Sequence, residues 1–162
     1  MGGRAAVARG YAAAMRTRLR LAAYAVLVSD GRILLSRLVP HLRDRSAAGL
    51  WTLPGGGVDP GEDPFDAVVR EVGEETGHRA RMTALLGVDS LVRDGLHSVR
   101  VLYEGEVTGG ELRAEPDGST DLAAWHPLDA LPGLPHVELV DAGLRLWRER
   151  PPAGHLGQGS PR

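Results

Sequence analysis

The stretch from Gly55 to Gly77 constrains the fold of this 162-residue chain most, because it marks the end of a strand segment and both ends of one helix. The glycines at positions 55–57 interrupt a short apolar segment that reads as a buried strand. Asp63 suits the N-cap position of a helix, and Pro64 suits its first turn. Gly77 suits the left-handed residue just past the helix end. The sequence therefore predicts a helix over residues 64–76.

This predicted helix has one apolar side and one charged side. An arc of roughly 100° holds the apolar residues Phe65, Val68, Val69 and Val72, which are expected to face the core. The other side holds the charged residues Arg70, Glu71, Glu74 and Glu75. The glutamates are one, three and four residues apart, so they can converge on one cation, and carboxylate oxygens suit Mg²⁺. A solvated helix face is the alternative, but like-charge repulsion and the mid-helix Gly73, which costs about 1 kcal/mol, both weigh against it.

These residues carry a family resemblance. Seven of them stand at the spacing of the Nudix box: Gly56, Glu62, Arg70, Glu71, Glu74, Glu75 and Gly77. Chance produces such a match in on the order of 10⁻⁸ to 10⁻⁹ of windows. Over about residues 19–149 the chain therefore resembles the Nudix hydrolase family. His78 departs from the pattern, because the family usually has an aliphatic residue there.

The resemblance implies a fold and an activity. The implied fold is α/β of the α+β type, a Nudix-like α/β/α sandwich around a mixed β-sheet. The implied reaction is hydrolysis of a diphosphate bond in a nucleoside diphosphate linked to another moiety, with Mg²⁺ as cofactor and Mn²⁺ as its substitute. A nucleoside triphosphate or a small nucleoside diphosphate derivative is the expected substrate, since signatures of ADP-ribose, NADH and dinucleoside polyphosphate enzymes are not evident.

The resemblance also assigns roles by position within the box. Glu74 and Glu75 match direct metal ligands, and Glu71 matches a ligand or a proton acceptor. Arg70 would orient Glu71. The backbone carbonyl of Gly56 would be a further metal ligand. The role implied for the box's first glutamate is to support the site through the arginine or through water, and this residue is Glu62.

Residues outside the box are candidates for accessory roles. Three arginines are candidates for contacts with substrate phosphates, with a solvated surface charge as the alternative for each: Arg37, Arg43 and Arg45. Three acids precede Trp125 where some relatives carry an additional acid that acts on metal or water: Glu115, Asp117 and Asp121. The histidines lack metal-ligand spacing, and Trp51 and Trp125 are assigned to the core.

The remaining pattern predicts strands at 21–28, 33–38, 50–53, 81–92, 98–107 and 122–126 and a closing helix at 136–149. The first two strands are expected to form a hairpin through the turn Ser29–Arg32. Residues 1–18 are interpreted as a flexible N-terminal extension, residues 19–149 as the Nudix domain and residues 150–162 as a disordered C-terminal tail.

Composition excludes several other classes. The net charge is −2, with 19 basic and 21 acidic residues, which argues against nucleic acid or an anionic membrane as a general partner. The absence of cysteine excludes disulfides and thiolate chemistry, and with it the isoprenoid isomerase branch of this fold, which relies on a cysteine. The basic N-terminus is not interpreted as a secretion signal, so a cytoplasmic location is expected.

Two questions stay open at this point. A catalytically silent Nudix-like module that senses a nucleotide is the rival hypothesis, although such a module would be expected to have lost at least one of the box acids. Relatives occur as monomers and as dimers, so a homodimer is one of two expected states.

Overall fold

The computed structural model describes residues 17–40, 47–113 and 118–156. In chain order, its elements are β1 (Arg18–Ser29), β2 (Arg32–Leu38), β3 (Trp51–Thr52), β4 (Gly55–Gly57), α2 (Pro64–Thr76), β5 (His78–Arg93), β6 (Leu96–Gly110), β7 (Thr120–Pro127), the 3₁₀ helix η1 (Leu128–Gly133) and α3 (Glu138–Glu149). Each strand and helix expected from the sequence is present, and α2 has the predicted bounds.

The sheet is mixed, and β1 is its central strand. β1 pairs in parallel with β6, from Arg18 opposite Leu96 to Leu27 opposite Gly105. It pairs antiparallel with β4 and, at its C-terminal end, with β2. β5 pairs antiparallel with β6 and ends that side of the strand order, while β2 also carries β3 and β7. The expected β1–β2 hairpin closes through two residues with positive φ, Asp30 at 50° and Gly31 at 71°, as a two-residue turn requires.

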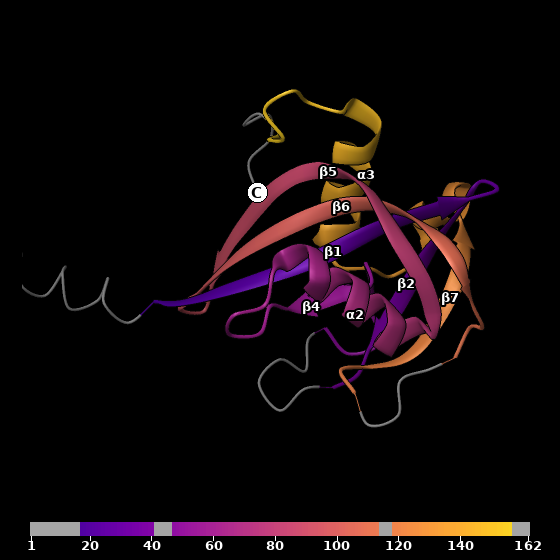
Figure 1. Ribbon diagram of the computed structural model, residues 1–162, viewed down its shortest axis with the longest axis horizontal. Helices are drawn as coiled ribbons and strands as arrows, with labels where there is room; N and C mark the ends of the chain where they lie inside the picture. Colours follow the sequence, from indigo (N-terminus) through magenta and orange to yellow (C-terminus); the bar gives the residue numbers. More distant parts are fainter. Residues whose placement is uncertain (1–16, 41–46, 114–117, 157–162) are drawn as a thin grey trace, which may run out of the picture.

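Helices cover both faces of the sheet, which confirms the expected α/β/α sandwich (Figure 1). α2 packs on one face, where Val68 and Val72 meet Ala23, Ala25 and other residues of one apolar cluster. α3 and η1 pack on the opposite face, and their apolar side chains form a second cluster with alternate residues of β1 and with residues of β2 and β6. No helix in the described ranges is both long enough and apolar enough to span a membrane.

The local sequence signals at the ends of α2 act as predicted. The carboxylate of Asp63 accepts a hydrogen bond from the Phe65 amide at 2.8 Å, and Gly77 takes the left-handed conformation with φ of 75°. The predicted apolar face is wrong for Phe65, which is exposed and lies edge-on to Tyr103 with 5.7 Å between ring centroids. The buried side of α2 includes Glu75, whose carboxylate accepts a hydrogen bond from a backbone amide inside the protein.

The C-terminal tail also differs from the expectation. Residues 150–156 are placed against the domain, whereas the tail was expected to be disordered from residue 150. The Val88 amide of β5 donates to the Gly154 carbonyl at 2.9 Å, and Leu156 packs against the cluster under α3. Gly87 permits this approach, because a Cβ there would lie 2.1 Å from the Gly154 carbonyl oxygen. Residues 157–162 lie outside the described part of the chain.

Candidate functional site

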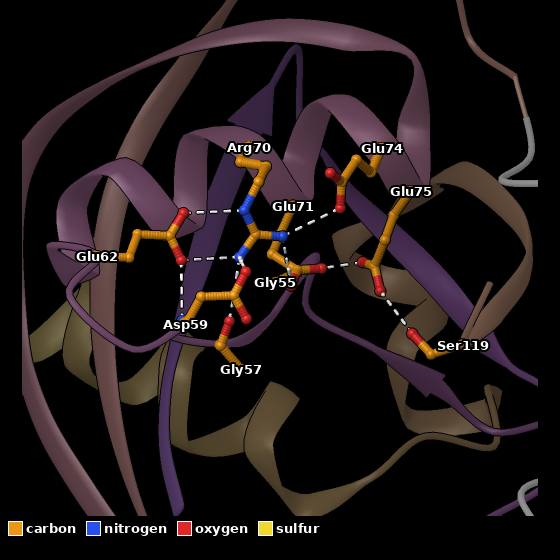
Figure 2. A network of polar contacts seen from close by, with 9 residues as sticks. All are labelled: Gly55, Gly57, Asp59, Glu62, Arg70, Glu71, Glu74, Glu75 and Ser119. Carbon is orange, nitrogen blue, oxygen red and sulfur yellow. Dashed lines mark hydrogen bonds and ion pairs between the residues drawn. The ribbon is translucent and has the colours of Figure 1, made fainter.

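The charged side of α2 faces the glycine strand β4 and is organised around one guanidinium group (Figure 2). The Nη1 atom of Arg70 donates to Glu71 at 3.0 Å and to Glu74 at 3.1 Å. Its Nη2 atom donates to the carbonyl of Gly57 at 3.2 Å. The arginine therefore ties two of the helix glutamates to the strand that follows the glycine break.

Glu62 holds the other side of the same guanidinium. Its two carboxylate oxygens accept from Arg70 Nε at 2.8 Å and from Nη2 at 2.9 Å, a bidentate pair. The Asp59 amide also donates to Glu62 at 3.0 Å. The bonds from Arg70, followed by the bond from Asp59, lower the pKa of Glu62 to about 2. Glu62 thus contacts Arg70 directly, which is one of the two routes of support that the resemblance implies.

Glu75 is the buried member of the group, with only 1% of its surface exposed. Its carboxylate accepts a hydrogen bond from the Gly55 amide at 3.1 Å. The Ser119 hydroxyl donates to the other carboxylate oxygen at 3.4 Å. Burial of an ionised carboxylate is costly unless such donors compensate it, so Gly55 and Ser119 help to keep this acid at the helix–sheet junction.

Glu71 lies directly over Gly56. A Cβ at position 56 would be 2.7 Å from the Glu71 carboxylate, closer than such atoms pack, so the site requires glycine there. The neighbouring Gly57 has open space at the same point. Glu74 is exposed, and its carboxylate reaches back to Arg70. The structure therefore gathers Gly56, Glu71, Glu74 and Glu75 around one helix face and one glycine strand.

The donor set suits a hard divalent cation, since carboxylate and carbonyl oxygens are the ligands that Mg²⁺ prefers. Within the described ranges, however, no group of three His, Asp or Glu side chains is arranged to hold a metal ion. The contacts explain this arrangement, because Arg70 bonds both Glu71 and Glu74 while Glu75 turns toward Gly55. The residues present fit the chemistry of a cation.

Arg37 and Asp121 are brought together by the pairing of β2 with β7. Arg37 Nε and Nη2 donate to the two oxygens of Asp121 at 2.9 and 3.0 Å. This pair lowers the pKa of Asp121 through the hydrogen bonds from Arg37. The candidate phosphate ligand and the candidate accessory acid thus satisfy each other. The other accessory candidates lie outside the described residues: Arg43, Arg45, Glu115 and Asp117.

The assignment of Trp51 and Trp125 to the core agrees with the structure. Trp51 is buried and packs edge-on against His126 with 4.2 Å between ring centroids. Trp125 packs against the cluster under α2. Sequence reasoning missed Ser119 and the backbone amide of Gly55. Ser119 lies within the acidic stretch 115–121, which is the one signal that could have pointed to it.

Comparison with known proteins places this geometry in a family. A family model described as the NUDIX domain matches residues 18–155. An ADP-ribose pyrophosphatase of Methanocaldococcus jannaschii is 36% identical over 127 residues, which cover 76% of this chain and 71% of the relative. The NAD-capped RNA hydrolase NudC of Chromobacterium violaceum is 36% identical over 110 residues, which cover 68% of this chain. The chain spans only 39% of the length of that second relative.

A solved structure agrees at the level of the fold. The crystal structure of a MutT NUDIX hydrolase from Burkholderia pseudomallei superimposes with a TM-score of 0.69 at 33% sequence identity. The superposition covers 80% of this chain and 98% of that one. The family match extends over the strands and helices that hold the Arg70 network.

Proposed function

The chain belongs to the NUDIX family, and on that premise we propose that it hydrolyses a diphosphate bond in a nucleotide derivative with the help of a divalent cation. The observation that carries the proposal is the gathering of Glu71, Glu74 and Glu75 at one junction of α2 with β4. Glutamates three and four residues apart repel each other, so helix stability alone does not account for three acids at one junction.

In this proposal Glu71, Glu74, Glu75 and the Gly56 carbonyl hold the cation, with Mg²⁺ preferred and Mn²⁺ as its substitute. Such a cation would neutralise the diphosphate oxygens and acidify a water molecule. Glu71 is also the candidate proton acceptor, because its carboxylate lies against Gly56 at the edge of the site. Arg70 sets the position of Glu71 by hydrogen bonding, and Glu62 fixes Arg70 from the other side.

We propose a nucleoside triphosphate or a small nucleoside diphosphate derivative as the substrate. The names of the relatives support diphosphate-linked nucleotides in general, since one is an ADP-ribose pyrophosphatase and another acts on NAD-capped RNA. The net charge of −2 favours a small molecule over a nucleic acid chain as the general partner. The cytoplasmic location expected from the sequence is part of the same proposal.

The test is a hydrolysis assay on the full chain with millimolar Mg²⁺. The panel contains nucleoside triphosphates, nucleoside diphosphate sugars, ADP-ribose, dinucleoside polyphosphates and an NAD-capped RNA oligonucleotide. We expect hydrolysis of at least one small nucleotide, and we expect chelator to abolish it. Mg²⁺ alone should raise the melting temperature, because a ligand that binds only the native state stabilises it by mass action.

The same assay separates the enzyme from the rival sensor module. A catalytically silent module would show stabilisation by metal and nucleotide without release of phosphate products. The presence of all three box acids in one network favours the enzyme. If the whole panel gives no stabilisation and no hydrolysis, that result contradicts both the enzyme and the sensor hypothesis.

A further inference from the structure

α2 covers only part of its face of the sheet, and apolar side chains lie exposed beyond it. Three of them are more than half exposed: Leu19 at 72%, Val92 at 64% and Leu85 at 62%. Val88, Leu21 and Phe65 are also exposed. We call these six residues the outer apolar strip: Leu19, Leu21, Phe65, Leu85, Val88 and Val92.

Strand register shows that the strip is continuous. Leu19 of β1 and Val92 of β5 both pair with His97 of β6, so they flank it in one row across the sheet. The next row on the same face joins Leu21 to Ser90 through Val99. Further rows place Val88 beside Val101 and Leu85 beside Tyr103, and the ring of Tyr103 contacts Phe65 of α2.

Charge is absent from these rows and concentrated on the other face of the same strands. Within the rows just described, no position is Asp, Glu, Arg or Lys. The intervening positions of β5 and β6 carry Asp89 and Arg100, which form an ion pair toward α3. The open face therefore leaves apolar side chains in solvent, whereas a sheet face that meets water ordinarily carries polar residues.

The free edge of β5 is partly blocked. The outward amide of Val88 donates to the Gly154 carbonyl, so the C-terminal turn occupies the edge at that point. Another strand therefore meets an obstacle if it is added at Val88. The accessible apolar surface is the flat face of the strands, which favours face-to-face contact over extension of the sheet.

The size of the strip fits an interface. The exposed fractions of its side chains correspond to roughly 600 Å² of apolar surface, at the upper limit for a patch without a partner. A standard interface buries about 800 Å² per partner, so the strip would form most of one side. We propose that the outer apolar strip is the surface through which two copies of this chain associate, sheet face against sheet face.

A second copy is the occupant that the chemistry favours. An interface with two-fold symmetry brings each residue type near its own kind, which charged surfaces tolerate poorly and an uncharged apolar surface tolerates well. Two twisted sheets pack face to face at about 30° with interdigitating side chains, and Val, Leu and Phe side chains suit that geometry. The proposal does not depend on the hydrolytic activity.

The experiment measures the mass of the full chain in solution by sedimentation velocity and light scattering between about 1 and 100 µM. We expect a dimer, with twice the monomer mass of 17.2 kDa. The double variant Leu19→Asp/Val92→Asp should weaken association at least about 100-fold, because it places charges inside the apolar contact. Leu112→Asp is the matched control, since this exposed leucine lies outside the strip and its variant should remain dimeric.

Ser90→Arg provides a second test at an exposed polar position of the same rows, in case the double variant does not fold. Circular dichroism and Mg²⁺-dependent hydrolysis report the fold of each variant independently of its mass. A monomer at 100 µM, or dimers that survive both sets of substitutions, would overturn the proposal. Dimerisation only after removal of residues 1–14 would also overturn it, by assigning the strip to the N-terminal segment instead.

Discussion

Arginine–carboxylate clusters stand on both faces of the sheet, and they differ in exposure and charge balance. The side chain of Arg70, on the α2 face, is 31% exposed, and all three of its nitrogens donate hydrogen bonds. The side chain of Arg100, on the α3 face, is only 9% exposed. It pairs with Asp89 of β5 and, at 2.7 Å, with Glu138 of α3, while its buried Nε finds no partner among the described residues.

This difference indicates that the α2 cluster is a candidate functional site and that the α3 cluster is a structural ion-pair cluster. The α2 cluster contains more carboxylates than one guanidinium can neutralise, and solvent reaches it, so its ion pairs can be exchanged for a cation. In the α3 cluster the Arg100–Asp89 pair is buried, and breaking a buried ion pair leaves an uncompensated charge behind. A second structural ion pair lies at the C-terminal end of α3, where Arg150 donates two hydrogen bonds of 2.7 Å to Glu104 of β6.

The largest expected effect is on catalysis at the α2 cluster. Glu71→Gln and Glu75→Gln should each lower kcat about 10³-fold, equivalent to about 4 kcal/mol, because each removes a charge that the cation requires. Glu62→Gln should lower the rate much less, since it acts through Arg70. Steady-state kinetics with Mg²⁺ measures all three. Glu106→Gln, in an exposed pair with Arg81, is the control that should keep wild-type rates. Equal and small effects at positions 62, 71 and 75 would contradict the site.

Removal of the Arg100 side chain should lower the stability of the fold. Arg100→Ala should lower the free energy of unfolding by about 3 kcal/mol, because Asp89 is left buried without its cation. Urea denaturation followed by circular dichroism measures the change. Arg81→Ala breaks an exposed pair and should change stability by less than about 0.5 kcal/mol. A loss below about 1 kcal/mol for Arg100→Ala would show that the Arg100–Asp89 pair contributes no more than an exposed pair.

Adjacent glycines offer a matched pair at the site. Gly56→Ala should push the Glu71 carboxylate away from β4 and lower kcat at least about tenfold. Gly57→Ala should leave kcat near the wild-type value, because a Cβ there meets open space. Both variants should melt close to the wild type, which excludes unfolding as the cause. Identical rates for the two would contradict the proximity of Glu71 and Gly56.

Protonation of Glu104 at acid pH should remove the stabilisation that its ion pair with Arg150 provides. Hydrogen bonds from Arg150, with a further one from Trp147, lower the pKa of Glu104 from 4.5. A lowered folded-state pKa means that the stabilisation is fully present above about pH 5 and is lost as the pH falls below 4.5 toward the folded pKa. Glu104→Gln should therefore cost about 1 kcal/mol at pH 7 and almost nothing at the acid end. The melting temperatures of wild type and Glu104→Gln should therefore converge as the pH falls from 7 to 3. A constant difference between the two melting temperatures over this range would contradict the linkage.

The smallest expected effect is a gain in stability within α2. Gly73→Ala should raise the free energy of unfolding by about 0.5–1 kcal/mol, because alanine restricts the unfolded chain and favours helix. A Cβ at position 73 would meet only the His78 carbonyl, at an ordinary 3.8 Å. Thermal melting measures the gain, and kinetics should be unchanged. Lower activity with higher stability would show instead that the glycine serves the site.

Local signals in the sequence predicted the helix and its acids accurately. Asp63, Pro64 and Gly77 specify the ends of α2 through their own backbone and capping chemistry, and the box spacing places the glutamates on one side. Those features depend on neighbours within a few residues, so one sequence is sufficient to predict them.

Features that depend on distant partners escaped prediction. The bond from Ser119 to Glu75 and the pairing of Arg37 with Asp121 depend on how β7 aligns with β2. Phe65 fits an apolar arc, yet it is exposed, while Glu75 is buried against a backbone amide from β4. The position of the tail depends on Gly87, a residue with no local signal of that contact.

The central place of β1 has a consequence for the order of folding during synthesis. β1 leaves the ribosome before the other described strands and helices, but its longest pairing is with β6, which follows β2, α2 and β5 in the chain. Until residue 105 has emerged, the β6 side of β1 cannot be completed, and its apolar residues must wait beside the early β2 hairpin. Such long-range parallel pairing is slow to form. Newly made chains are therefore expected to be most prone to aggregation in the interval before β6 reaches its place beside β1.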